Sequence, residues 1–257
     1  MTQDRLDKVR EILGEKLDAS FDLRFGGSVA KHTYVDGLSD VDTLLVLRDG
    51  NKRMKPSAIL ADLAASLAQG LPREVTVSRG TLAVTLSFPG GDEIQIVPAI
   101  KFAKGLHVSA WEKDAWSRID PEGFRRALVR VNDACASKLI PTIKLAKAVN
   151  ATLPEAQRLS GYHIESMAIA AFKGHQGPFG VEKMLPQFFR KMVDLVKAPI
   201  KDSTGQSVHV DEYLGRPNSE KRQQASHLLD RIARRMENAL ASRSMDQWNS
   251  ILGESPA

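Results

Sequence analysis

Two aspartates ahead of a short apolar run constrain the fold of this chain more than any other feature. Asp40 and Asp42 flank Val41, and residues 43–47 carry no charge. An uncharged run of this length, rich in leucine and valine, is typical of a buried strand. Residues two apart on a strand point to the same face, so we expect both carboxylates to project together from its start. Carboxylates held that close repel each other unless a cation lies between them.

A Gly-Gly-Ser turn precedes the aspartates. Gly26 and Gly27 lead to Ser28, which stands twelve residues before Asp40 and is expected to open a brief helix over residues 28–35. Glycine lets the backbone turn sharply and approach a ligand closely, and the N–H groups at a helix N-terminus favour an anion. Mg²⁺ takes oxygen ligands and is usually held by one or two carboxylates plus substrate phosphates. The two motifs together suggest chemistry on a nucleoside triphosphate.

The combination resembles the signature of the DNA polymerase β-like nucleotidyltransferase superfamily, which is Gly-Ser, a short helix, then Asp-x-Asp entering a strand. Gly27-Ser28 and Asp40-Val41-Asp42 match this signature in order and spacing. The resemblance implies an α/β (α+β) fold, in which a palm with a mixed sheet is followed by a helical domain. It also implies that Asp40 and Asp42 bind Mg²⁺ or Mn²⁺, and that Gly27 and Ser28 bind the triphosphate. The alternative from the residues alone is that Asp40 caps a turn and Asp42 is a solvated strand-end residue.

A third carboxylate is expected on a hairpin later in the palm. Strands over residues 80–88 and 93–100 are predicted from their β-rich sequence and the Pro- and Gly-containing turn between them. In relatives with a hydrophobic-Asp-hydrophobic-Val-Pro pattern, the aspartate lies three residues before the proline. Here the proline is Pro98 and that position holds Gln95, which cannot act as a base and is a poor metal ligand beside carboxylates. Glu93 lies two residues earlier, on the same strand face.

Three interpretations of Gln95 stay open. Glu93 takes over the catalytic role, or Gln95 belongs to a subgroup that works with two carboxylates, or Gln95 marks an inactive protein. We favour a functional enzyme with Glu93 or Gln95 at the site. From the residues alone, Glu93 is almost as well explained as an exposed hairpin residue.

The remaining elements follow from periodicity and capping. Helices are expected over residues 2–17, 57–69, 123–140, 142–153, 159–171, 180–196 and 219–240, a first strand over 21–26, a further strand beginning at 75–77, and a loop over 100–116. Pro141 is expected to break or kink the helix that Asp120 and Pro121 begin. The predicted domains are a palm with its N-terminal helix over 1–117 and a helical nucleotide- or substrate-binding domain over 118–257.

Two lysines on one helix of the second domain are candidate phosphate ligands. Lys144 and Lys147 are three residues apart, so they lie on one helical face. In polymerase β-like relatives with a helical second domain, a lysine of the corresponding helix reaches the triphosphate. Lys147 is the better match, although Val149 stands where the family usually has tryptophan. The alternative for each lysine is a solvated helix face.

The sequence Ser160-Gly161-Tyr162 offers a second candidate for phosphate binding. With Glu165 it is similar to the Ser-Gly-Tyr-x-x-Glu helix of archaeal CCA-adding enzymes and the Ser-x-x-hydrophobic-Glu helix of the cGAS/DncV-like nucleotidyltransferases. The resemblance implies that Ser160 and Tyr162 contact the nucleotide phosphates. A helix N-terminus with hydroxyl donors also suits a phosphate. The alternative is a capping serine and a packing tyrosine.

The composition is that of a globular protein suited to anionic ligands. The chain has 257 residues, 42% of them apolar and 26% charged, with a net charge of +5. The single cysteine, Cys135, excludes an internal disulfide and a cysteine metal cluster. The N-terminus lacks the apolar core of a signal peptide, and no apolar run approaches the roughly 20 residues of a membrane span. We therefore expect a cytoplasmic protein with no membrane partner.

Three functions stay open, the first two implied by the resemblance and the third suggested by Gln95. The first is a bacterial cGAS/DncV-like nucleotidyltransferase (CD-NTase) that converts nucleoside triphosphates into a cyclic di- or oligonucleotide signal in antiphage defence. The second is CCA-type tailing of an RNA acceptor, although about 140 residues after the palm leave little room for RNA-binding domains. The third is a non-catalytic nucleotide-binding sensor, which Gln95 would explain directly. Base preference, product linkage, an activating protein partner and the oligomeric state stay open.

Overall fold

The computed structural model describes most of the chain. The described residues are 2–16, 21–25, 33, 41–47, 54–91, 93–103, 105–110, 114–201, 203–204 and 210–253. Gly27, Ser28, Asp40 and the helix expected from Ser28 lie outside them. The chain divides into two compact units, Met1–Ala30 with Asp40–Asp120 and Lys31–Ser39 with Pro121–Ala257. Thr33 is the described residue of the stretch 31–39.

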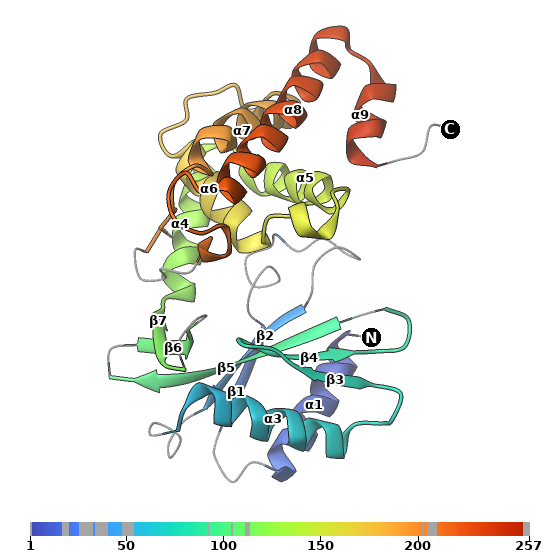
Figure 1. The fold of residues 1–257 in the computed structure, drawn as a ribbon, viewed down its shortest axis with the longest axis vertical. Coiled ribbons are helices and arrows are strands. Elements are labelled where there is room, and N and C mark those ends of the chain that lie inside the picture. Colours follow the sequence, from blue (N-terminus) through green and yellow to red (C-terminus); the bar gives the residue numbers. More distant parts are fainter. Residues whose placement is uncertain are drawn as a thin grey trace. The chain divides into compact units, whose positions relative to one another are not determined.

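The first unit is built on a mixed sheet (Figure 1). Its strands are β1 (Phe21–Phe25), β2 (Val41–Leu47), β3 (Thr76–Arg79), β4 (Val84–Ser87), β5 (Glu93–Phe102), β6 (Gly105–Ser109) and β7 (Trp116–Ile119). The order is β1-β2-β5-β4-β3, and β6 joins β5 to β7. The β2–β5 pair is parallel, whereas the other described pairs are antiparallel. The predicted mixed α/β fold is confirmed.

The two faces of this sheet differ in character. Ile94 and Ile96 on β5 and Leu86 on β4 are fully buried, while the alternate residues are only half-buried. Helices α1 (Thr2–Lys16) and α3 (Pro56–Gly70) lie on one side of the sheet (Figure 1). Each helix buries an apolar stripe, made of Leu6, Val9, Ile12 and Leu13 on α1 and of Ile59, Leu60, Leu63 and Leu67 on α3. The helices therefore cover the apolar face, and the other face keeps the polar residues of β4 and β5.

The loop predicted over residues 100–116 is wrong. Strand β5 continues to Phe102, and β6 and β7 extend the sheet through antiparallel pairs. Gly105, the first residue of β6, has a φ of +116°, which glycine adopts readily. The indole of Trp116 donates to the Met54 carbonyl at 3.1 Å. Strands β6 and β7 are only five and four residues long, too short for a clear period-two pattern to show in the sequence.

The second unit is helical. It contains α4 (Pro121–Ala134), α5 (Leu139–Ala151), η2 (Glu155–Gln157), α6 (Gly161–Phe172), α7 (Val181–Leu195), η3 (Glu212–Leu214), α8 (Glu220–Ser242) and α9 (Met245–Leu252). Helices α7 and α8 pack side by side (Figure 1). One apolar core joins these helices through side chains such as Phe172, Phe188 and Met236. In the described part of the chain, no helix combines the length and the apolar character that crossing a membrane requires.

The single helix predicted over residues 123–140 is also wrong. Helix α4 ends at Ala134, Ala136 and Ser137 take positive φ angles, and α5 begins at Leu139. Pro141 lies in the first turn of α5, where backbone N–H groups have no intrahelical partner and proline is tolerated. The buried Asn132 accepts the Ile140 N–H through its side-chain oxygen at 3.0 Å, which fixes this start. Helix α9 was not expected; Ser244 caps it by accepting the Gln247 N–H.

Candidate functional site

The parallel pairing of β2 and β5 places the second aspartate opposite the unexpected glutamine. Asp42 is the register partner of Gln95, and Gln95 is in turn the register partner of Thr85 on β4. Residues paired in this way share a face of the sheet. The row formed by these three positions lies on the polar face, because the neighbouring positions Ile94 and Ile96 of β5 are buried on the other face. Gln95 therefore occupies the position next to Asp42 on the central strand.

Glu93 lies on the same face but is engaged on the β4 side. Its carboxylate accepts the hydroxyl of Ser87 at 2.7 Å, and Ser87 is its register partner. Strand β4 and strand β2 flank β5 on opposite edges. The carboxylate of Glu93 thus contacts the strand that does not carry Asp42. To face Asp42 with the oxygen that accepts from Ser87, Glu93 would have to release Ser87.

The residue types paired at this position suit a hard divalent ion only in part. Aspartate supplies the carboxylate oxygens that Mg²⁺ prefers, whereas the neutral amide of Gln95 is a poor ligand beside carboxylates. Within the described residues, no three His, Cys, Asp or Glu side chains gather into a metal site. The second carboxylate of the predicted pair, Asp40, is outside that part of the chain. The assignment of Mg²⁺ to Asp40 and Asp42 therefore stays a prediction from the sequence.

Lys147 is buried in an ion pair within the helical unit. Its ammonium donates to the Glu165 carboxylate at 2.9 Å and to the carbonyl and hydroxyl of Thr33 at 3.0 and 3.4 Å. Lys147 and Glu165 are 7% and 1% exposed, and Thr33 is fully buried and donates its hydroxyl to Glu165. An ammonium group has three donors, and here each faces a protein acceptor. A phosphate contact from Lys147 would require this network to open, whereas Lys144 is exposed on α5.

This network joins Thr33 to two helices of the helical unit. Thr33 lies between Ser28 and Asp40 in the chain, and it contacts α5 through Lys147 and α6 through Glu165. Sequence reasoning missed Thr33 and the role of Glu165. A signal was present, because Glu165 stands among the apolar residues Ile164, Met167 and Ala168 of α6, and a buried acid requires a partner.

The residues Ser160 to Tyr162 form the N-terminus of α6, as predicted. Ser160 is the N-cap, and its hydroxyl oxygen accepts the His163 N–H at 3.2 Å. The ring of Tyr162 packs at 4.9 Å from the ring of Phe124. A Cβ built on Gly161 would lie 3.4 Å from the Lys147 ammonium. The structure therefore brings Lys147 beside the Ser160–Tyr162 turn.

A buried polar cluster behind this turn was missed from the sequence. The Tyr213 hydroxyl lies 2.9 Å from Nδ1 of His163, and Nε2 of His163 lies 3.7 Å from Asp211. Asp211 is paired with Arg222 at 2.7 Å, and both are buried. Burial lowers the pKa of His163 to about 4; Asp211 opposes this shift and Arg222 adds to it. Burial also raises the pKa of Tyr213 to about 12. His163 is therefore neutral and Tyr213 protonated at neutral pH.

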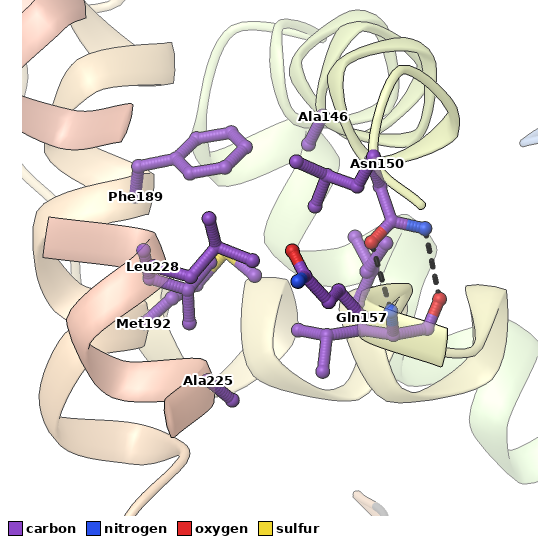
Figure 2. A pocket seen from close by; sticks show the side chains of 11 residues that line it. Ala146, Asn150, Gln157, Phe189, Met192, Ala225 and Leu228 are labelled. Carbon is purple, nitrogen blue, oxygen red and sulfur yellow. Dashed lines mark hydrogen bonds between the residues drawn. The ribbon is translucent and has the colours of Figure 1, made fainter. Parts of the chain in front are cut away.

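A small pocket beside α5 does not have the character of a nucleotide site (Figure 2). Its lining is mainly apolar, with Phe189, Met192 and Leu228 on one side and Asn150 and Gln157 on the other, and it contains no charged side chain. Asn150 uses its amide to clamp Leu159, donating to its carbonyl at 2.9 Å and accepting its N–H at 2.8 Å. Asn150, which lines the pocket, therefore fixes the backbone of Leu159, the residue before Ser160.

The first part of the chain matches a known domain family. Residues 6–114 match the family model described as a nucleotidyltransferase domain. No curated protein matches the sequence. Solved structures, however, match nearly the whole chain. The structure of E. coli MS115-1 CdnC with ATP gives a TM-score of 0.74 at 17% identity, covering 98% of this chain and 90% of that one.

Two further structures extend the likeness. The CD-NTase CdnG of Bradyrhizobium diazoefficiens, in complex with GTP, gives a TM-score of 0.73 at 16% identity and covers 97% of this chain and 88% of that one. The fold is that of the bacterial CD-NTases. The Vibrio cholerae DncV cyclic AMP-GMP synthase, in complex with a linear intermediate, gives 0.71 at 12% identity and covers 91% and 69%. A second structure of the E. coli protein is a CdnC:HORMA-deltaN complex.

The predicted site residues fall into two groups along the chain. The nucleotidyltransferase domain match spans Gly27, Ser28, Asp40, Asp42, Glu93 and Gln95. Lys144, Lys147, Ser160 and Tyr162 fall in the helical unit that follows it. At this level of identity the likeness shows the fold, and the role of each residue remains a prediction from the sequence.

Proposed function

We propose that this protein is a metal-dependent nucleotidyltransferase that joins nucleoside triphosphates into a cyclic di- or oligonucleotide. The observation that carries the proposal is the CD-NTase fold over 98% of the chain, with Asp42 on the strand next to β5. The solved relatives are described with ATP, GTP or a linear dinucleotide intermediate. A signal of this type would suit the role in antiphage defence that the sequence resemblance implies.

The chain's own residues divide into two groups by role. We assign Asp40 and Asp42 to the metal, and Gly27 and Ser28 to the β- and γ-phosphates. A bound Mg²⁺ would neutralise triphosphate charge and assist departure of pyrophosphate. From the helical unit, Ser160, Tyr162 and Lys144 would contact the phosphates, and Lys147 would do so once its network with Glu165 and Thr33 opens. The Ser160 hydroxyl suits this role, because an oxygen that accepts a capping hydrogen bond keeps its proton for donation to an anion.

A third group has to deprotonate the attacking hydroxyl. Gln95 lies beside Asp42 but has no site that accepts a proton at neutral pH. Glu93 has such a site and is two residues away, yet it is hydrogen-bonded to Ser87. We assign the role to Glu93, acting after it releases Ser87.

Gln95 itself favours a second candidate function. A glutamine in register with Asp42 removes one negative charge from the row that would otherwise bind the metal. A protein of this kind could bind a nucleotide without turning it over and serve as a sensor. By analogy with the CdnC:HORMA-deltaN complex, this protein could also require a protein partner for activity.

Product analysis tests the proposal directly. The purified protein is incubated with labelled ATP, GTP, CTP and UTP in Mg²⁺ and then in Mn²⁺, treated with phosphatase, and the products are separated. We expect a phosphatase-resistant product, lost in Asp42→Asn and retained in Asp62→Asn, which changes an exposed aspartate of α3. Full activity of Asp42→Asn would contradict the metal assignment.

If the wild type forms no product, it is compared with Gln95→Asp in the same assay. Activity gained by Gln95→Asp would support the sensor, because only the missing carboxylate would then separate this site from a catalytic one. No product from either form, alone or with an RNA acceptor, together with no binding of any of the four nucleotides, would refute both functions.

A further inference from the structure

A closed ring of three hydrogen bonds surrounds the N-terminus of α6. The backbone N–H of Ser160 donates to the Tyr213 hydroxyl at 3.0 Å. The Tyr213 hydroxyl lies 2.9 Å from Nδ1 of His163. The backbone N–H of His163 donates to the Ser160 hydroxyl oxygen at 3.2 Å, which closes the ring. Ser160 is thus held through both its main chain and its side chain.

The direction of each bond follows from donor chemistry. The Tyr213 oxygen accepts from Ser160, so its single proton is left for His163. Nδ1 of a neutral His163 is then the acceptor, and the imidazole proton resides on Nε2, the nitrogen nearer Asp211. The charge state agrees with this arrangement, since burial keeps the pKa of His163 well below its ordinary value.

Tyr213 is the member of the ring that comes from outside α6, and it is itself firmly anchored. It belongs to η3, directly after Asp211 and Glu212. The guanidinium of Arg222 on α8 is fully buried and donates to the carboxylate and carbonyl of Asp211 and to the carbonyls of Val196, Ala198 and Gly215. Arg222 therefore fixes the turn on which Tyr213 is carried.

We propose that Tyr213 is a positioning residue that sets the orientation of Ser160 for the nucleotide phosphates. The inference rests on the proposed function, because it takes Ser160 as a phosphate contact. Tyr213 does not touch the ligand in this proposal. Its hydrogen bond to the Ser160 N–H fixes the N-cap before the nucleotide binds. The Ser160 hydroxyl and the N–H groups of the first turn of α6 then lose little conformational entropy on binding.

The test compares two deletions of a hydroxyl group. Tyr213→Phe keeps the ring, which packs against His163 at 5.9 Å between centroids, and removes the oxygen that links Ser160 to His163. Ser226→Ala removes another hydroxyl of the same unit, the one that donates to the Val193 carbonyl at 2.8 Å on α7. Thermal unfolding establishes that both variants fold.

Two measurements test the positioning role of Tyr213 separately from the proposed nucleotidyltransferase function. Hydrogen exchange of residues 159–165 is measured without nucleotide, and equilibrium binding of each magnesium nucleoside triphosphate is measured in parallel. We expect Tyr213→Phe to speed exchange at Ser160 at least tenfold and to weaken binding of the preferred nucleotide about tenfold, while Ser226→Ala changes neither. His163→Asn, which keeps an acceptor near the Nδ1 position, should retain slow exchange at Ser160.

Each contrary result has a distinct meaning. Unchanged exchange at Ser160 in Tyr213→Phe overturns the positioning role whatever the protein binds. Faster exchange with unchanged nucleotide affinity also overturns it, since the held orientation would then not serve the ligand. A wild type that binds none of the four nucleotides overturns the proposed function, and the inference with it. Should Tyr213→Phe fail to fold, fast exchange at Ser160 in a folded His163→Asn would refute the ring.

Discussion

Acidification should destabilise this protein through His163. The side chain is fully buried, and burial lowers its pKa from 6.5 to about 4. Because the folded pKa lies below the unfolded one, the unfolded chain binds a proton between about pH 6.5 and pH 4 that the native protein does not. Stability therefore rises with pH across this window, is complete above it, and falls as the pH is lowered.

The magnitude follows from the two pKa values. One pKa unit corresponds to about 1.4 kcal/mol. At pH 5 the histidine of the unfolded chain is almost fully protonated, whereas the native one, with a pKa of about 4, is still mostly neutral. We therefore expect His163 to remove about 2 kcal/mol of unfolding free energy between pH 7 and pH 5. Other titrating groups contribute over the same range, so the quantity to measure is a difference between variants.

Urea unfolding at pH 7 and pH 5 supplies that difference. His163→Asn removes the titrating group and keeps an acceptor for the Tyr213 hydroxyl, so it should lose about 2 kcal/mol less on acidification than the wild type. His227→Asn, at an exposed position of α8, should lose as much as the wild type. Equal losses in the wild type and His163→Asn would show that His163 is not held neutral in the native protein.

Two further changes test the contacts around α6 by equilibrium unfolding. Glu165→Leu leaves the buried Lys147 without its counter-charge and should lower the free energy of unfolding by about 3–5 kcal/mol. The double change Glu165→Leu with Lys147→Met should lower it far less, because apolar replacement of a buried pair is often neutral. An equal loss in both variants would show that the ion pair is not what stabilises this region. Asn150→Ala removes both hydrogen bonds to Leu159 and should cost about 1–3 kcal/mol, and a cost near zero would mean that water replaces the clamp.

Several elements could be predicted because their signals are local. The apolar stripe of the first helix, the hairpin with its Pro-Gly-Gly turn, and the serine caps at Ser160 and Ser219 each lie within a few residues of the structure they specify. Side-chain periodicity and capping act over one or two turns, so a single sequence is enough to recognise them. The prediction failed at β6 and β7, which are strands of only five and four residues, and at the end of α4, where Ala136 and Ser137 take positive φ angles.

The candidate site shows the same division. Asp42, Gln95 and Ser160 could be singled out from spacing and residue type, and their proposed roles remain predictions. Their surroundings could not be anticipated. Glu165 and Lys147 are 18 residues apart and Thr33 is 114 residues from Lys147, while Tyr213 reaches Ser160 from 53 residues away. Which buried polar groups meet depends on how the helices pack, and no local pattern encodes that.

By itself, the sequence determined the local elements of this protein and the residue types that could bind metal and phosphate, because those depend on neighbours along the chain. Only the tertiary structure decided that β5 lies parallel to β2, which sets Gln95 beside Asp42, and that Glu93 contacts Ser87 on the other edge. It also decided that Lys147 is buried with Glu165, and that Tyr213 closes the ring at Ser160. Desolvation makes each buried polar group require a partner, and packing of distant segments selects which partner it finds.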